Sequence, residues 1–392
     1  LDSGFTVDST LDAVDANVGD GRAEKDLFGN TTLRAAIMES NVLPGMQTLI
    51  VPDLGTFLLT IAGAEENAAR TGDLDIADNL RIIGDPDGNA AIDANALDRI
   101  FDVLPGVSLE LVNITVTNGV ANDGGAIRNR GMLTVTGGAI RDSHATFLGG
   151  GLFNDGDATL TGAQITGNSS DFRGGGVYNF DAAGANVLVI TNATLDDNHS
   201  AARGGGIYND DQLVLGQSTL SNNTAGSRGG GLFNSGGASL ANVTVSGNRA
   251  ASQGGGIGNE RQIVINSSTI VDNQADASGG GVSSISNGVE FLQVTVKNSI
   301  IAENLGLMAN NDVNGAFVSN GNNLIGDAGT ASGFINGASG DQVGNAQNPI
   351  DPLLGSLDDN GGPAFTHAPL FGSPVIDAGN NTGAPNVDQR GR

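Results

Sequence analysis

Two rows of side chains with regular spacing are the strongest candidates for binding chemistry in this chain. The first row is aromatic and recurs at steps of 25 or 30 residues, at Phe153, Tyr178, Tyr208 and Phe233. The second row is cationic and stands directly before three glycine triplets, at Arg173, Arg203 and Arg228. Aromatic rings beside guanidinium groups can bind a sugar chain or an acidic polymer, and they can equally stack on each other and pair with nearby carboxylates. The rows therefore predict either a polysaccharide-binding surface or a structural stack.

The aspartates are a second set of candidates, for binding a hard cation. The chain holds 43 acidic and 17 basic residues, so its net charge is -26. Ca²⁺ takes oxygen ligands, and two regions offer them: Asp73 and Asp75 in a Gly-Asp-Leu-Asp loop, and Asp351, Asp358, Asp359 and Asp377 near the C-terminus. Solubility of a secreted protein and ordinary aspartate turns explain the same acidity. A surface of this charge repels nucleic acid and anionic membranes, so neither is expected as a partner.

Catalysis on a polysaccharide is a third possibility. His144 and His199 fall two repeats apart, as do Asp142 and Asp197, and stacked repeats would separate each pair by roughly 10 Å. That distance is near the upper end of the carboxyl separation in inverting glycosidases, but it is too long for two histidines to share one metal ion. A lyase would need cations beside a uronate, and the arginine row is the only candidate. The spacings favour isolated surface residues, so we assign no catalytic residue from the sequence.

A repeated glycine motif must position these side chains. Three glycines, an aliphatic residue, a variable residue and an asparagine recur from Gly149, Gly174, Gly204, Gly229 and Gly254, with weaker copies from Gly124 and Gly279. The step is 25 residues except for one of 30, and a fixed period in this range indicates stacked supersecondary units. Short apolar segments between Gly, Asn and Ser turns, without helical periodicity, predict three short parallel sheets. The expected fold is therefore all-β, a right-handed parallel β-helix.

Stacked coils predict ladders of like residues. Aliphatic residues such as Ile127, Leu152 and Val177 should form an inward stack, and the asparagines two positions later should bond one another along the axis. A second asparagine ladder follows from an apolar-x-x-Asn signature, at Asn168, Asn198, Asn223, Asn248 and Asn273. Because side chains alternate across a strand, the aromatic row must point outward, and we expect it to be exposed or half-covered.

The chain divides into three regions. Residues 1–117 hold an N-terminal cap and irregular first coils, residues 118–304 hold the regular β-helix repeats, and residues 305–392 hold C-terminal coils and a closing cap. A short capping helix is expected over residues 33–41, after Thr31 and Thr32, since threonine is a good N-cap, and before a Pro-Gly stop. No apolar run approaches the ~18 residues of a membrane span. Because the chain begins at Leu1 without a leader, we expect a mature or excised segment of an extracellular or cell-surface protein.

The glycine motif, paired with the apolar-x-x-Asn signature, resembles the repeats of polymorphic outer-membrane proteins and related bacterial surface β-helices. The segment Phe5–Ser9, followed by Thr32–Ile37, is similar to the CSLREA-type segment that opens many such secreted proteins, although Ala35 replaces its usual acidic residue and no Cys precedes it. Several C-terminal pieces are similar to choice-of-anchor domains, among them Asn323–Gly326, Gly372–Gly379 and Asp388–Gly391. The resemblance implies an exported protein, surface-attached or released, and it implies no activity.

Two functions remain open at this point. The first is a non-catalytic cell-surface, adhesive or matrix-forming module that assembles with itself, because the ends of a β-helix offer strand edges unless they are capped. The alternative is a polysaccharide-binding or polysaccharide-degrading protein, a lyase or hydrolase, that uses the aromatic and arginine rows. Ca²⁺ is the one cofactor that the acidity suggests.

Overall fold

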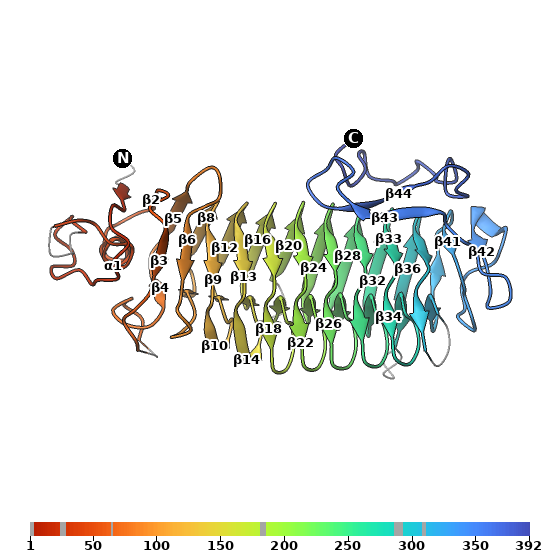
Figure 1. Cartoon of the computed structure of the whole chain (residues 1–392), viewed down its shortest axis with the longest axis horizontal. Coiled ribbons are helices and arrows are strands. Elements are labelled where there is room, and N and C mark those ends of the chain that lie inside the picture. The colour runs from red at the N-terminus through yellow and green to blue at the C-terminus, as the bar shows by residue number, and fades with distance from the viewer. Residues whose placement is uncertain (1–3, 24–28, 64–65, 181–185, 286–292, 308–310) are drawn as a thin grey trace.

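The computed structural model describes residues 4–23, 29–63, 66–180, 186–285, 293–307 and 311–392. The chain forms a right-handed parallel β-helix, as the repeat predicts, and Figure 1 shows its coils stacked in one row. Each regular coil contributes one strand to each of four parallel sheets, so the prediction of three sheets is wrong. The sheet that was missed consists mostly of two-residue strands, which are too short to show a periodic pattern in the sequence.

We number the sheets in the order in which a regular coil meets them. Sheet 1 comprises β4 (Leu74–Ile76), β7 (Phe101–Val103), β11 (Ile127–Asn129), β15 (Leu152–Asn154), β19 (Val177–Asn179), β23 (Ile207–Asn209), β27 (Leu232–Asn234), β31 (Ile257–Asn259), β35 (Val282–Ser284) and β39 (Val313–Asn314). Sheet 2 comprises β1 (Gly4–Thr6), β2 (Gln47–Val51), β5 (Leu80–Gly84), β8 (Ser108–Val112), β12 (Met132–Thr136), β16 (Asp157–Thr161), β20 (Val187–Thr191), β24 (Gln212–Gly216), β28 (Gly237–Ala241), β32 (Gln262–Asn266), β36 (Gln293–Lys297) and β40 (Val318–Ser319).

The other two sheets complete each coil. Sheet 3 comprises β3 (Thr56–Leu58), β6 (Ala91–Asp93), β9 (Thr115–Thr117), β13 (Ala139–Arg141), β17 (Gln164–Thr166), β21 (Thr194–Asp196), β25 (Thr219–Ser221), β29 (Thr244–Ser246), β33 (Thr269–Val271), β37 (Ile300–Ala302), β41 (Leu324–Ile325) and β42 (Gln342–Val343). Sheet 4 comprises β10 (Val120–Asp123), β14 (His144–Leu148), β18 (Ser169–Ser170), β22 (His199–Ser200), β26 (Thr224–Ala225), β30 (Arg249–Ala250), β34 (Gln274–Ala275) and β38 (Leu305–Gly306).

Left-handed backbone conformations make the corners of the coils. The first glycine of a triplet has a positive φ, +67° at Gly174, and a Cβ there would lie 2.5 Å from the carbonyl oxygen of Val177. The corner between sheets 3 and 4 places Asp142, Asp197 and Asn222 at φ values of 53°, 53° and 54°. Gly, Asn and Asp tolerate this region best among the amino acids. The glycine and asparagine content of the repeat is therefore a requirement of its turns.

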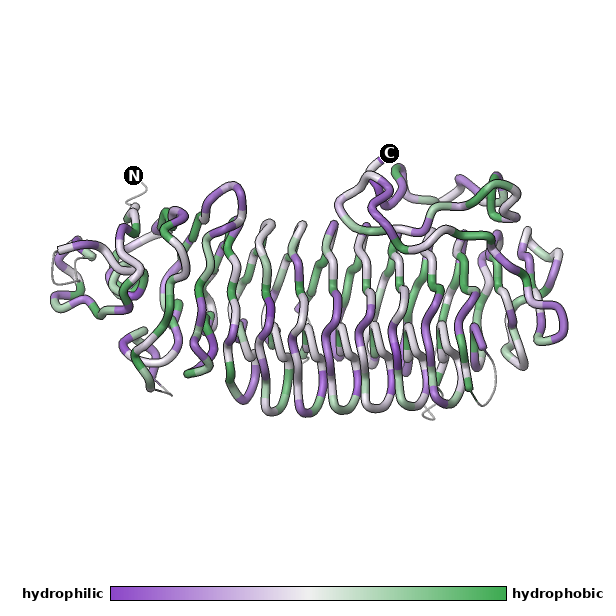
Figure 2. Tube along the Cα trace, in the orientation of Figure 1, coloured by the Kyte–Doolittle hydropathy of each residue, from purple (hydrophilic) through white to green (hydrophobic). Residues whose placement is uncertain are grey.

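The interior of the coil is an aliphatic stack flanked by the two predicted asparagine ladders. Figure 2 shows hydrophobic and hydrophilic positions alternating along the coils. In the first ladder Asn154 Nδ2 donates to Asn179 Oδ1 at 2.8 Å, and in the second Asn223 Nδ2 donates to Asn248 Oδ1 at 2.9 Å. The second ladder ends at Asp312, whose carboxylate accepts from Asn304 Nδ2 at 2.9 Å. Both ladders are confirmed, and they satisfy amides that burial would otherwise leave unpaired.

Helix α1 (Leu33–Ser40) closes the N-terminal end of the core, which confirms the predicted short helix. The side-chain oxygen of its N-cap, Thr32, accepts a hydrogen bond from the Ala35 N–H at 3.2 Å. The Arg34 side chain is fully buried, pairs with Asp12 at 2.6 Å, and reaches the loop that precedes β4. In the described part of the chain, no helix is long and apolar enough to cross a membrane.

The C-terminal end of the core is covered by the segment that precedes residue 351. Phe317 is buried in the core, and Phe334 packs on it with ring centroids 5.1 Å apart. A short 3-10 helix, η1 (Ala338–Gly340), leads into β42. Both ends of the β-helix are therefore covered by the chain's own side chains.

Residues 351–392, which we call the C-terminal strap, run back along the outside of the β-helix beside sheet 3 (Figure 1). The strap contains an antiparallel hairpin of β43 (Leu354–Asp358) and β44 (Thr366–Pro369). Hydrogen bonds tie it to sheet 3, for example from Thr219 Oγ1 to Phe365 O at 2.6 Å. Beneath it the outward positions Val271 and Ala302 are fully buried, whereas β25 and β29 place Ser221 and Ser246 in the same column.

Candidate functional site

The middle residues of the sheet 1 strands form one outward-facing column, which we call the outer column. Register pairs place its members side by side on successive strands, in the order Asp75, Asp102, Arg128, Phe153, Tyr178, Tyr208, Phe233 and Gly258. Two acidic residues at the N-terminal end are therefore followed by an arginine and then by four aromatic rings. The column joins the predicted aromatic row to one of the predicted Ca²⁺ ligands.

The four aromatic rings form a continuous stack. Ring centroids lie 5.8 Å apart for Phe153 and Tyr178, 4.9 Å for Tyr178 and Tyr208, and 5.2 Å for Tyr208 and Phe233. The rings point away from the coil as expected, but they are only 9%, 3%, 3% and 0% exposed, so the expectation of an exposed or half-covered row is wrong. Side chains from neighbouring turns cover the rings and build a second apolar cluster with them: Leu148, Phe172, Phe180 and Ile285.

The arginine row helps to cover this stack. The Arg173 guanidinium lies 4.5 Å from the Phe172 ring centroid and 5.0 Å from that of Tyr208, and Arg203 lies 4.9 Å from Phe233. Arg228 pairs with Glu260 at 2.9 Å, and Arg203 approaches the same carboxylate at 3.7 Å. Burial, together with the Asp210 carboxylate, raises the pKa of Tyr178 above its ordinary value. The alternative in which arginines stack on rings and pair with a carboxylate therefore describes these two rows.

An acidic cluster stands at the N-terminal end of the outer column. Asp73, Asp75 and Asp102 each offer a carboxylate oxygen, and these three oxygens all lie within 4.8 Å of one another. The three residues are 3%, 0% and 1% exposed. The fold thus brings the predicted Asp73 and Asp75 to Asp102, which sequence reasoning missed. A signal was present, because Phe101-Asp102-Val103 repeats the apolar-Asp-apolar pattern of Leu74–Ile76.

Three arginines surround two of these carboxylates. Arg99 pairs with Asp73 at 2.7 Å, while Arg128 and Arg130 pair with Asp102 at 2.5 and 2.6 Å. Burial raises the pKa of Asp73 to about 6, and Arg99 offsets part of that effect. Burial, followed by the charge of Asp73, raises the pKa of Asp75 to about 7.

At Asp102 the arginines together have a larger effect on the pKa than burial has. Burial disfavours its charged form, but hydrogen bonding to Arg128 and the charges of Arg128, Arg130 and Arg99 outweigh burial and lower its pKa. The cluster therefore combines one firmly ionised carboxylate with two that resist ionisation, a combination that attracts either protons or a cation.

The other predicted Ca²⁺ ligands are exposed residues of the strap. Asp351, Asp358 and Asp359 accept hydrogen bonds from backbone N–H groups one or two residues ahead, at 2.7, 2.8 and 2.9 Å. Asp377 is exposed and has a φ of 59°. Within the described ranges, the cluster of Asp73, Asp75 and Asp102 is the one group of three potential metal ligands that comes together.

The histidine and aspartate pairs lie where the stacking predicts. His144 and His199 share a column of sheet 4 with Ser169 between them, and His144 Nδ1 lies 3.0 Å from Ser169 Oγ. Asp142 and Asp197 occupy left-handed corner positions in two non-adjacent coils. The pairs therefore keep the two-coil separation that led us to assign no catalytic residue.

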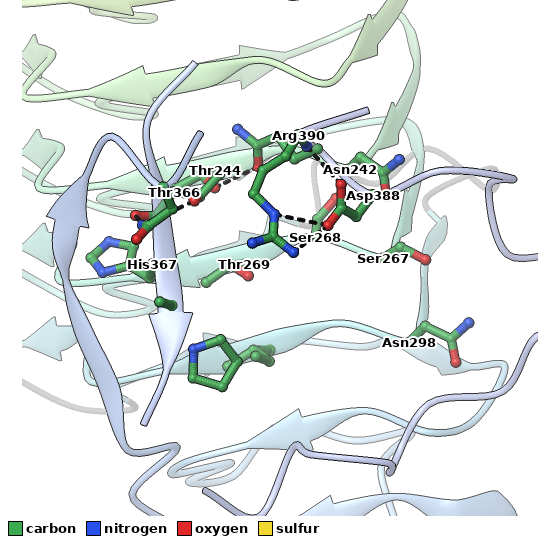
Figure 3. Close-up of a pocket in the computed structure, with 15 residues that line it drawn as sticks. Asn242, Thr244, Ser267, Ser268, Thr269, Asn298, Thr366, His367, Asp388 and Arg390 are labelled. Atoms are coloured by element: carbon green, nitrogen blue, oxygen red, sulfur yellow. Dashed lines mark hydrogen bonds and ion pairs between the residues drawn. The ribbon is translucent and has the colours of Figure 1, made fainter. Parts of the chain in front are cut away.

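A polar cavity of about 360 Å³ opens between the strap and sheet 3 (Figure 3). Three successive coils form its floor, through Asn242, Thr244, Ser267, Ser268, Thr269, Asn298 and Ile300. The strap forms the rest of its wall, through Asn360, Thr366, His367, Ala368, Pro369, Asp388, Gln389 and Arg390. Amide, hydroxyl, imidazole, carboxylate and guanidinium groups thus converge on one cavity that also has small apolar surfaces.

Hydrogen bonds between strap and sheet hold the cavity wall in place. His367 Nδ1 lies 2.7 Å from Gly355 O, and its Nε2 lies 2.9 Å from Ser246 Oγ. Gln389 Oε1 accepts from Thr244 Oγ1 at 2.7 Å. Figure 3 shows the Arg390 side chain crossing the cavity, with its guanidinium bonded to Asp388 at 2.9 and 2.6 Å.

The Asp388 carboxylate remains ionised in this pair. Partial burial opposes its charge, but hydrogen bonds from Arg390 and from the backbone of Arg392 and Arg390 outweigh that effect and lower its pKa. Sequence reasoning missed the cavity, because its two walls are at least 60 residues apart in the chain. The available signal was partial: the outward column of sheet 3 changes from serine to Val271 and Ala302, but the strap also contacts the serine part of that column, at Ser246.

Comparisons with known proteins add little to this picture. No protein-family model matches the sequence, and no curated protein matches it. Among solved structures, the crystal structure of pectate lyase Pel9A is similar, with 13% sequence identity, a TM-score of 0.42, and coverage of 95% of this chain and 90% of that chain. A similarity of this extent is not evidence for a shared activity.

Proposed function

We propose that this protein is a non-catalytic, extracellular saccharide-binding β-helix that serves as a cell-surface or matrix module. The main support for this function is the cavity between the strap and sheet 3, where polar groups from three coils converge on groups from the strap. Saccharide hydroxyls both donate and accept hydrogen bonds, and the cavity presents both kinds of partner. Ile300, Ala368 and Pro369 add apolar surface for the C–H face of a sugar ring.

The dimensions of the cavity suit one or two sugar units. Neighbouring coils are about 4.8 Å apart, so a floor of three coils spans about 10 Å. Recognition pockets for small ligands combine a largely preformed shape with a few fixed polar groups. Gln389 and His367 are fixed in this way, because each is bonded to sheet 3 and is 9% exposed.

In this proposal the protein attaches to polysaccharide through the strap. Coverage of the two core ends by α1 and Phe334 supports this choice over attachment through open strand edges. In this proposal the buried aromatic row and the half-buried arginine row stabilise the β-helix and do not form the saccharide-binding surface. Cleavage of the polysaccharide by a lyase or hydrolase mechanism is the alternative outcome, and the same experiment detects it.

The test is a binding screen of the full chain against neutral and uronate-containing polysaccharides by calorimetry. Arg390→Met keeps the aliphatic stem and removes the guanidinium, so binding should weaken about tenfold or more. Thr269→Trp should fill the cavity and abolish binding. The matched control is Arg249→Met, which also removes an arginine bonded to an aspartate, at 2.7 Å, but lies on sheet 4.

Chain length of each bound polymer is measured in parallel. We expect no shortening and no new reducing or unsaturated ends. Absence of binding across the panel, or binding that neither Arg390→Met nor Thr269→Trp weakens, would refute the proposal. Depolymerisation by the wild type would replace the binding function with the enzymatic alternative.

A further inference from the structure

The N-terminal end of the outer column carries an electrostatic imbalance. Asp75 and Asp102 lie in register on β4 and β7, so two carboxylates face the same side of adjacent strands. Like charges placed directly opposite each other destabilise a sheet unless something neutralises them. Asp73 brings a third carboxylate from the turn that precedes β4, and all three are buried.

The arginines neutralise only part of this cluster. Arg99 is directed at Asp73, and Arg128 and Arg130 are directed at Asp102. Asp75 Oδ2 accepts the Ala69 N–H at 2.9 Å. Among the described residues, no hydrogen-bond partner reaches Asp75 Oδ1, although Asp75 is fully buried. An ionised oxygen without a partner is strongly disfavoured in such a place, so native proteins either protonate it or supply an occupant.

We propose that Asp73, Asp75 and Asp102 bind one Ca²⁺ ion. Calcium–oxygen distances are about 2.3–2.6 Å, so two ligands of one ion lie at most about 4.6–5.2 Å apart. The three carboxylate oxygens lie within 4.8 Å of one another and fit that limit. All three ligands are hard oxygen donors, which suit Ca²⁺ and not the nitrogen and sulfur preference of Zn²⁺.

The loop that carries Asp73 and Asp75 is built tightly around the site. Arg34 of α1 donates to Ala69 O at 3.0 Å, Gly72 O at 2.8 Å and Asp73 O at 3.2 Å. A Cβ on Gly72 would lie 2.5 Å from Gly63 O, so the loop leaves no room for a side chain there. The ion would therefore connect the capping helix, this loop and the first strands of sheet 1. Its role is to lock the N-terminal cap, and it is independent of the saccharide cavity.

The site is tested by metal content and by thermal unfolding of the full chain. Because the ligands are buried, exchange is expected to be slow, so the protein is unfolded and refolded in EDTA or in millimolar CaCl₂ and then desalted. Mass spectrometry should find about one calcium ion per chain after refolding with CaCl₂. The unfolding midpoint of that sample should lie several degrees above that of the EDTA sample.

Variants assign the ion to the cluster. Asp75→Asn and Asp73→Asn should lose the bound calcium, whereas Asp359→Asn, an exposed strap aspartate, should retain it. Calcium-free wild-type protein after refolding in CaCl₂ would overturn the proposal, and so would calcium retained by both cluster variants. If a proton occupies Asp75 Oδ1 instead, wild type binds no calcium and Asp75→Asn is at least as stable at neutral pH, which also overturns it. The wild-type comparison remains decisive if a variant does not fold.

Discussion

Asp75 and Asp102 stand in register on neighbouring strands, and both carboxylates are buried on the outer side of sheet 1. Of these two carboxylates, only that of Asp102 has arginine partners among the described residues. The outer column therefore begins with a charged cluster and continues into the stacked rings. This arrangement makes the N-terminal end of the column a place where single substitutions have large effects.

Replacing Asp102 with Asn should destabilise the protein by about 3 kcal/mol, because it leaves Arg128 and Arg130 without their carboxylate. Denaturant unfolding in EDTA measures this loss without a contribution from a bound ion. The matched control is Asp276→Asn, which removes the partner of the surface residue Arg249 and should cost less than about 1 kcal/mol. Equal losses in both variants would show that burial of the Asp102 pair contributes nothing.

Replacing Phe233 with Ala should cost about 3–5 kcal/mol, because Phe233 is fully buried within the ring stack. Guanidinium unfolding followed by circular dichroism gives the change in the free energy of unfolding. Phe371→Ala is the control, since Phe371 is fully exposed on the strap and its loss should change stability by less than about 0.5 kcal/mol. A small loss at Phe233 would mean that the outer stack is not a second core.

The end of the second asparagine ladder predicts a pH dependence. Burial raises the pKa of Asp312 from its ordinary value to about 6, despite hydrogen bonds from Asn304 and Asp327 N–H groups. The native state thus holds this proton more tightly than the unfolded chain does. The resulting stabilisation is present below about pH 4 and is lost as the pH rises to about 6, a change of about 3 kcal/mol.

Subtracting the stability of Asp312→Asn from that of the wild type isolates this group, because the variant cannot titrate there. The difference should fall by about 2–3 kcal/mol between pH 4 and pH 7. A difference that stays constant, or that rises with pH, would contradict the raised pKa. Constant calcium-free conditions keep the acidic cluster from contributing a binding term.

The strap should open independently of the β-helix when the hydrogen bonds of Gln389 are removed. Gln389 bonds to Thr244 Oγ1 at 2.7 Å and to Thr219 Oγ1 at 3.0 Å, so Gln389→Ala removes contacts with two coils. Hydrogen exchange should then quicken in residues 351–392 while the asparagine ladders keep their protection. Gln347→Ala, at an exposed position before the strap, is the control and should leave exchange unchanged. Faster exchange throughout the coils would show that strap and β-helix unfold together.

The features that the sequence alone determined are those that recur along the chain. The 25-residue step predicted the coil, the aliphatic stack and both asparagine ladders, because each residue meets its own equivalent in the next coil. Helix α1 was predictable from local capping chemistry at Thr32. Asp73 and Asp75 were identified as ligand candidates because they are neighbours in one loop.

Only the tertiary structure decided the features that depend on contacts between segments distant in the sequence. Phe153 and Phe233 point outward, as alternation requires, yet turns from other parts of the coil bury them. Asp102 reaches Asp75 only because β4 and β7 pair in register. The cavity exists only because the strap returns over sheet 3, so that His367 meets Ser246 across 121 residues of chain. Periodicity specifies contacts between equivalent residues, but it carries no information about the non-repeating segments that cover them.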